Sequence, residues 1–128
     1  MWSPWCASCS PAAAHSTTAR IKSCRASPCI TVGGHSKGLQ SVRVKTQIGH
    51  VVLAADASHL YTHIDGGRVF PLVHNVEDVV EGYETLKRLA GAPRRVVPGH
   101  DPAVLTRYPT AKPGLEGWVV RLDAEPKL

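Results

Sequence analysis

The first 55 residues contain no aspartate or glutamate, although they carry six of the fifteen lysines and arginines. The rest of the chain holds nine basic and ten acidic side chains, so the net charge of +5 arises in the first part. The basic residues are scattered, and aromatic residues make up only 5% of the chain. Nucleic-acid-binding surfaces cluster basic side chains and interleave them with aromatic ones, so we expect no nucleic-acid partner.

Cysteine is absent after residue 29, and no apolar run approaches the roughly 20 residues that span a bilayer. A fold held together by disulfides would need cysteines throughout the chain. The N-terminus also lacks the continuous apolar core of a secretory signal. We therefore expect a cytoplasmic protein that does not associate with membranes.

Residues 1–29 differ in composition from the remainder of the chain. They are rich in serine, alanine, cysteine and proline, and they show no apolar periodicity. We predict a disordered or unrelated leader over 1–29 and a partial domain over 30–128. An alternative remains open, because the pairs Cys6-x2-Cys9 and Cys24-x4-Cys29 approach the spacing of a zinc ribbon. On that reading the chain is a non-enzymatic protein with a zinc-binding leader.

From residue 30 onward the pattern predicts an α/β domain. Alternation over 39–46 and the apolar run 51–56 predict a β-hairpin, and Asp65-Gly66-Gly67 with Pro71 predict a loop over 57–73. Asn75 and Gly91 are expected to cap a helix, and strands are expected at 94–100 and 117–122, with Trp118 packed in the latter. The apolar stripe of the predicted helix consists of Val76, Val79, Val80, Tyr83, Leu86, Leu89 and Ala90.

Three polar residues follow predicted strands directly. His35 comes after Val32-Gly33-Gly34, Asp56 ends the run 51–56, and His100 comes after the predicted strand that begins at residue 94. Strand ends are where α/β proteins assemble their sites, and the glycines allow unusual backbone angles. Two imidazoles and a carboxylate suit zinc or a similar divalent ion.

The segments "VGGHSKGLQSVRV", "VVLAADASHLY" and "RRVVPGHDPAVL" resemble the C-terminal half of a metallo-β-lactamase-fold hydrolase, and more narrowly an N-acyl homoserine lactonase. The resemblance covers about residues 30–124. It implies an αββα sandwich, a site for two zinc ions, and opening of a lactone ring that silences bacterial quorum signals. By the same match, His35 resembles a ligand of one metal, Asp56 a bridging carboxylate, and His100 a ligand of the other metal.

The family motif H-x-H-x-D-H, which supplies the remaining ligands, is absent from this sequence. The family commonly has a tyrosine three residues after the bridging aspartate; here His59 holds that position and Tyr61 lies two residues further on. Either residue could polarise the substrate carbonyl. We therefore expect a truncated lactonase-like hydrolase with little or no activity. A different metallo-β-lactamase-fold substrate, such as a thioester or a β-lactam, remains the alternative.

Overall fold

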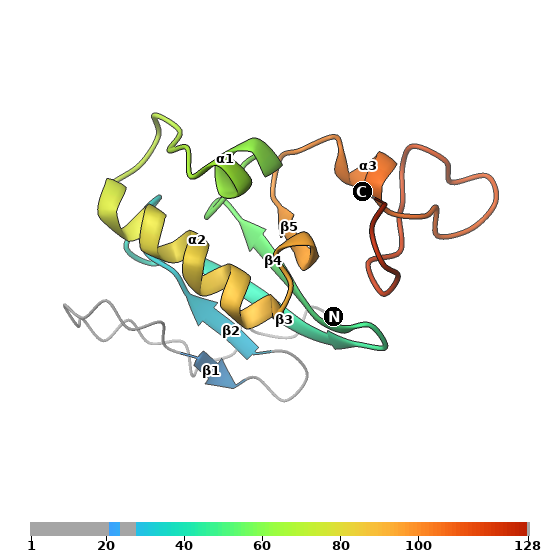
Figure 1. Ribbon diagram of the computed structural model, residues 1–128, viewed down its shortest axis with the longest axis horizontal. Coiled ribbons are helices and arrows are strands. Elements are labelled where there is room, and N and C mark those ends of the chain that lie inside the picture. The colour runs from blue at the N-terminus through green and yellow to red at the C-terminus, as the bar shows by residue number, and fades with distance from the viewer. Residues whose placement is uncertain (1–20, 24–27, 128) are drawn as a thin grey trace, which may run out of the picture.

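The computed structural model describes residues 21–23 and 28–127, and most of the predicted leader 1–29 lies outside them. A five-stranded sheet runs in the order β1-β2-β3-β4-β5, antiparallel from β1 to β4 and parallel between β4 and β5 (Figure 1). The α/β prediction is confirmed. The elements are β1 (Ile21–Ser23), β2 (Pro28–Thr31), β3 (Gln40–Thr46), β4 (Gly49–Ala55), α1 (Tyr61–Gly66), α2 (Val76–Ala90), η1 (Pro93–Arg95), β5 (Val96–Pro98) and α3 (Val104–Arg107).

The predicted hairpin is confirmed by the pairing of β3 with β4. Arg43 lies opposite Val52 and Val42 opposite Leu53, so the two faces of the hairpin alternate along both strands. Ser41 is fully buried and donates a hydrogen bond to the Ala54 carbonyl at 3.0 Å. This hydrogen bond allows a polar side chain to lie in the core.

Helix α2 lies across one face of the sheet and forms the main core with it (Figure 1). Asn75 caps its first turn, with Oδ1 accepting hydrogen bonds from the amides of Glu77 and Asp78, and Gly91 ends the helix in a left-handed conformation. The buried stripe is Val79, Tyr83, Leu86 and Ala90, which repeats every three or four residues. The predicted stripe was too wide, because Val76 and Val80 point to solvent.

The predicted loop over 57–73 is wrong in its middle, where the structure has helix α1. Tyr61 and Ile64 face the interior, and Gly67 ends the helix with a φ of 62°. The glycines that predicted a loop therefore act as a helix stop. The first amide of the helix, that of Tyr61, donates to Asp101 Oδ2 at 2.8 Å, a partner 40 residues away that local sequence patterns do not reveal.

The predicted strand over 117–122 is also wrong. In place of a strand, the described residues of this segment form a single β-bridge, that of Thr110 with Val120, and Trp118 is 84% exposed where packing was expected. Tyr108 and residues of this C-terminal segment form a second apolar cluster. Its members are Val51, Val97 and Tyr108, with Ile48, Leu53, Val104, Val120 and Leu122 packed against them. No helix in the described part of the chain is both long and apolar enough to cross a bilayer.

Candidate metal centre

Three strands deliver the predicted site residues to one end of the sheet. Strands β2, β4 and β5 run in the same direction, because β3 is antiparallel to both of its neighbours and β5 is parallel to β4. His35, Asp56 and His100 each follow the carboxyl end of one of these strands. The sheet topology therefore gathers residues that are 65 positions apart along the chain.

The backbone at Ala55 is strained directly before Asp56. Ala55 has a φ of 49°, the left-handed region that side chains other than glycine rarely adopt, and the β4–β5 register shifts between Leu53 and Ala55. A register shift at a strand end redirects the residue that follows. Here it precedes the carboxylate at the centre of the candidate site.

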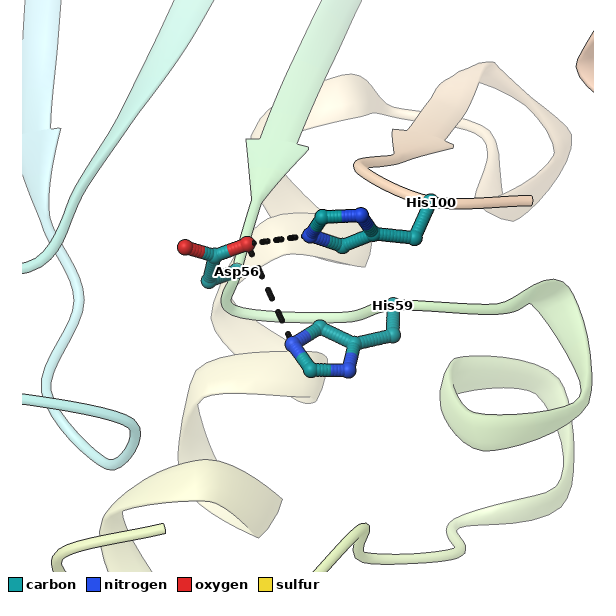
Figure 2. A group of neighbouring side chains, drawn as sticks. All are labelled: Asp56, His59 and His100. Atoms are coloured by element: carbon teal, nitrogen blue, oxygen red, sulfur yellow. Dashed lines mark hydrogen bonds and ion pairs between the residues drawn. The ribbon is translucent and has the colours of Figure 1, made fainter. Parts of the chain in front are cut away.

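Asp56 lies among three imidazoles. Its Oδ1 is 2.7 Å from His100 Nε2 and 3.9 Å from His59 Nε2, and Figure 2 shows both rings directed at the carboxylate. Its Oδ2 is 3.9 Å from His35 Nε2. The structure thus brings together four of the five predicted site residues, and their roles as ligands or catalytic groups stay predictions.

Two glycines permit this close approach. A Cβ on Gly99 would lie 2.7 Å from the Ala55 carbonyl oxygen, and a Cβ on Gly34 would lie 2.8 Å from the backbone nitrogen of Val79. Gly34 also has a φ of +99°. Each glycine directly precedes a histidine, so the missing side chains set the positions of His35 and His100.

Hydrogen bonds and ring packing orient the imidazoles. His35 Nδ1 donates to the Leu72 carbonyl at 2.6 Å, and this contact turns Nε2 toward Asp56. The His59 ring stacks on Phe70 with centroids 3.8 Å apart. The His100 amide donates to the His59 carbonyl at 3.0 Å, so the two loops that bear these histidines are joined through their backbones.

The pKa values of two groups are displaced in the direction that metal binding requires. The hydrogen bond from His100, with the nearby imidazoles, holds the pKa of Asp56 below its usual range. Burial lowers the pKa of His59, and the proximity of His100 lowers it further. A carboxylate and a neutral imidazole are the forms that bind a metal, so these groups need lose no proton near neutral pH.

Tyr61, the fifth predicted site residue, does not join the group of side chains around Asp56. It is buried in α1, and the Arg107 guanidinium lies 3.7 Å from the centre of its ring. Its hydroxyl has no hydrogen-bond partner among the described residues, and burial raises its pKa far above the usual value. No described contact joins Tyr61 to Asp56, so its catalytic role stays a prediction.

Sequence reasoning missed two residues that support the site. Phe70 stacks on both His59 and His63, and Asp101 holds the start of α1 while its Oδ1 accepts from the Ala103 amide at 2.9 Å. Asp101 followed by Pro102 is a turn signal that could have indicated the second role. No sequence pattern around Phe70 indicates its contact with the two histidines.

The donor set fits a divalent metal ion. One ligand atom from each of Asp56, His59 and His100 can be chosen so that all three lie within 4.8 Å of one another. Imidazole nitrogen and carboxylate oxygen are common ligands of zinc and of other transition metals. The arrangement can therefore hold an ion at the end of the sheet, in a position open to solvent.

Comparison with known structures relates this architecture to lactonases. A quorum-quenching N-acyl homoserine lactone lactonase is 26% identical over 59% of this chain and 32% of its own, with a TM-score of 0.51. An N-acyl homoserine lactone hydrolase with N-hexanoyl-L-homoserine bound at its catalytic metal center is 24% identical over 62% and 32%, with a TM-score of 0.54. A B. thuringiensis AiiA mutant with N-decanoyl-L-homoserine at the active site gives the same values.

No protein-family model matches the chain, and no curated protein matches it. The chain spans about a third of the length of the lactonase structures to which it is similar. The resemblance to part of a metallo-β-lactamase-fold lactonase is therefore confirmed at the level of structure.

Proposed function

We propose that this chain carries part of the metal site of a hydrolase resembling the N-acyl homoserine lactonases, and that the 128 residues alone open lactones slowly or not at all. The proposal depends chiefly on one observation: three strand ends converge on Asp56 with ligand-competent side chains, in a fold shared with lactonases. Zinc is the ion we propose, and an acylated homoserine lactone is the substrate class.

Each residue is assigned a role from its position. We assign His35, Asp56 and His100 to the two-metal site of the whole hydrolase, because His35 and His100 each direct Nε2 at the Asp56 carboxylate, one toward Oδ2 and the other toward Oδ1. Asp56 and its neighbouring histidines would hold a divalent ion, which would supply a nucleophile from water near neutral pH and polarise the lactone carbonyl. The pKa of Asp56 is held low and the side chain is 42% exposed, so the carboxylate is ionised and accessible as a ligand at neutral pH.

His59 is a candidate for contact with either the ion or the lactone carbonyl, because its Nε2 faces Asp56. Phe70 covers one face of the His59 ring, which restricts the directions in which that ring can turn. Tyr61 would have to leave its buried position to reach a substrate, so we favour His59 over Tyr61 for this contact.

The number of ligands limits the activity expected of the chain alone. A catalytic zinc normally has three protein ligands and a water, and a two-metal site needs a set for each ion. The chain has no H-x-H-x-D-H motif to complete a second set. Loss of a single outer partner already costs about 10–100-fold in affinity or activity, and loss of several direct ligands costs more.

Lactone hydrolysis tests the proposal directly. The full chain is incubated with zinc and N-hexanoyl homoserine lactone, and ring opening is followed by proton release at constant pH. We expect turnover below about 1% of that of a lactonase measured in parallel, since more than one partner is missing. His100→Ala should remove whatever zinc-dependent turnover remains.

Two results would overturn the proposal. Turnover equal to that of the parallel lactonase would show that the site is complete without the missing motif. Zinc-dependent cleavage of a thioester or a β-lactam that is faster than cleavage of the lactone would assign the chain to another substrate class. A His50→Gln variant serves as the control, because His50 lies at the opposite end of β4 from Asp56.

A further inference from the structure

The donor atoms around Asp56 are not distributed evenly. Nε2 of His100 and Nε2 of His59 both lie near Oδ1, at 2.7 Å and 3.9 Å. Zinc bonds of about 2.0–2.2 Å in a tetrahedral arrangement place neighbouring donor atoms about 3.3 Å apart. The two measured distances lie on either side of this value, so small side-chain rotations would bring both imidazoles into a coordination sphere that includes Oδ1.

The backbone that carries these three donors is already fixed. The amide of Gly99 donates to the Ser58 carbonyl at 2.9 Å, and the amide of His100 donates to the His59 carbonyl at 3.0 Å. Stacking on Phe70 holds the His59 ring. A site whose ligands are positioned before binding loses little conformational entropy when the ion enters.

His35 belongs to the other side of the carboxylate. Its Nε2 is 3.9 Å from Oδ2, and its Nδ1 is fixed on the Leu72 carbonyl. The group of donors that lie within 4.8 Å of one another comprises Asp56, His59 and His100 and does not include His35. An ion on the Oδ1 side can therefore take three protein ligands without using His35.

We propose that the chain holds one divalent ion, bound by Asp56, His59 and His100, as a mononuclear site that is complete within these residues. The inference rests on the proposed function only in that both use Asp56 and His100 as ligands. The site is open to solvent, because His100 is 61% exposed and Asp56 is 42% exposed. Three protein ligands with an accessible remaining position are the arrangement of catalytic, rather than structural, zinc sites.

Metal stoichiometry tests this site without any substrate. The full chain is titrated with zinc by calorimetry, and the complex is weighed by native mass spectrometry. We expect one ion per chain. His59→Ala should weaken binding by at least about 100-fold, because losing an outer-shell partner already costs about 10–100-fold. His35→Ala should change the affinity by about tenfold or less, since His35 lies on the Oδ2 side of Asp56 and is not a ligand of this ion.

Further measurements separate a ligand role from a structural one. Circular dichroism and thermal melts without metal identify any variant that fails to fold, and His59→Gln is tested as a milder change. In the intact chain, the nitrogen NMR signal of His59 Nε2 should shift to a metal-bound position on zinc addition, whereas those of His50 should not. His50→Gln should bind zinc like the unchanged chain, because about 20 Å of extended strand separates it from Asp56.

The outcomes are distinct from those of the lactone assay. Two ions bound with similar affinity, or binding that survives His59→Ala and is lost with His35→Ala, would overturn the mononuclear site. An unchanged His59 Nε2 signal at zinc saturation would do the same. Failure to open a lactone would leave this result unaffected, because the titration measures the ion alone.

Discussion

At the scale of single residues, Gly99 determines how closely β5 approaches β4. An alanine there would bring its Cβ to 2.7 Å from the Ala55 carbonyl oxygen, a backbone atom that cannot move without displacing the strand. We expect Gly99→Ala to destabilise the fold by about 1–3 kcal/mol, the usual cost of overpacking. Urea unfolding followed by circular dichroism measures this change.

Gly38→Ala provides the matched control for Gly99→Ala. A Cβ on Gly38 meets no atom within 4 Å, so that change should leave the free energy of unfolding nearly unaltered. Equal stability of the two variants would show that the approach of β5 to β4 is not limiting. Because Gly99 precedes His100, the Gly99 variant should also bind zinc more weakly.

The identity of the site residues was predictable from the sequence, but the distances between them were not. His35, Asp56 and His100 follow apolar strands, and this local pattern is visible in the sequence. Their distances were not predictable, because these depend on the strand order and on the strained conformation of Ala55. The proximity of His59 to Asp56 likewise depends on how the loop folds back against β5.

At the scale of elements, the N-cap of α2 offers a clear test. Asn75 Oδ1 accepts from the amides of Glu77 at 2.9 Å and Asp78 at 3.3 Å. Asn75→Ala removes both acceptor contacts, and we expect a loss of about 1 kcal/mol in the free energy of unfolding. Asn75→Ser should retain most of the stability, because serine caps helices nearly as well. Equal melting temperatures for the alanine and serine variants would contradict the role of Asn75 as the N-cap of α2.

The two helices show why some elements are visible in a sequence and others are not. Helix α2 has its own cap, stop and apolar stripe, all within 17 residues, so its bounds were predicted almost to the residue. Helix α1 has six residues, no side-chain cap of its own, and glycines at its end. It depends on Asp101, which only the folded chain brings to its first amide.

At the scale of the whole molecule, Glu125 ties the C-terminal segment to η1. Its carboxylate accepts hydrogen bonds from Arg94 Nε at 3.0 Å and from Arg95 Nη2. These bonds, that of Arg95 foremost, hold the pKa of Glu125 below its ordinary value of 4.5. A carboxyl with a depressed pKa stabilises the fold above that ordinary value, and the contribution is lost as the pH falls through the folded pKa.

We therefore expect Glu125→Gln to be less stable than the unchanged chain at neutral pH, and the difference to shrink as the pH falls below about 4.5. Thermal melts at a series of pH values measure this difference. Glu81→Gln on the exposed side of α2 is the control, and its effect should not vary with pH in the same way. A stability difference for Glu125→Gln that stays constant down to acid pH would contradict the ion-pair account.

The tail that Glu125 ties down was the least predictable part of the fold. Its apolar residues suggested a strand, but they pack on Val51, Val97 and Tyr108 without forming a ladder. Hydrophobic pattern alone does not distinguish a strand from an irregular segment that covers a sheet. Its docking depends on partners from β4, β5 and η1, which are distant in sequence.

The left-handed alanine at position 55 has a consequence for anyone who engineers this scaffold. A left-handed conformation costs an ordinary residue about 1–2 kcal/mol, which glycine would avoid. The Cβ of Ala55 also restricts the backbone angles at this position, and this restriction limits the directions in which the neighbouring Asp56 carboxylate can point. Glycine at position 55 would remove this cost but would also widen the range of backbone angles directly before Asp56, so a screen for thermostability alone would favour a change that loosens the position of the carboxylate.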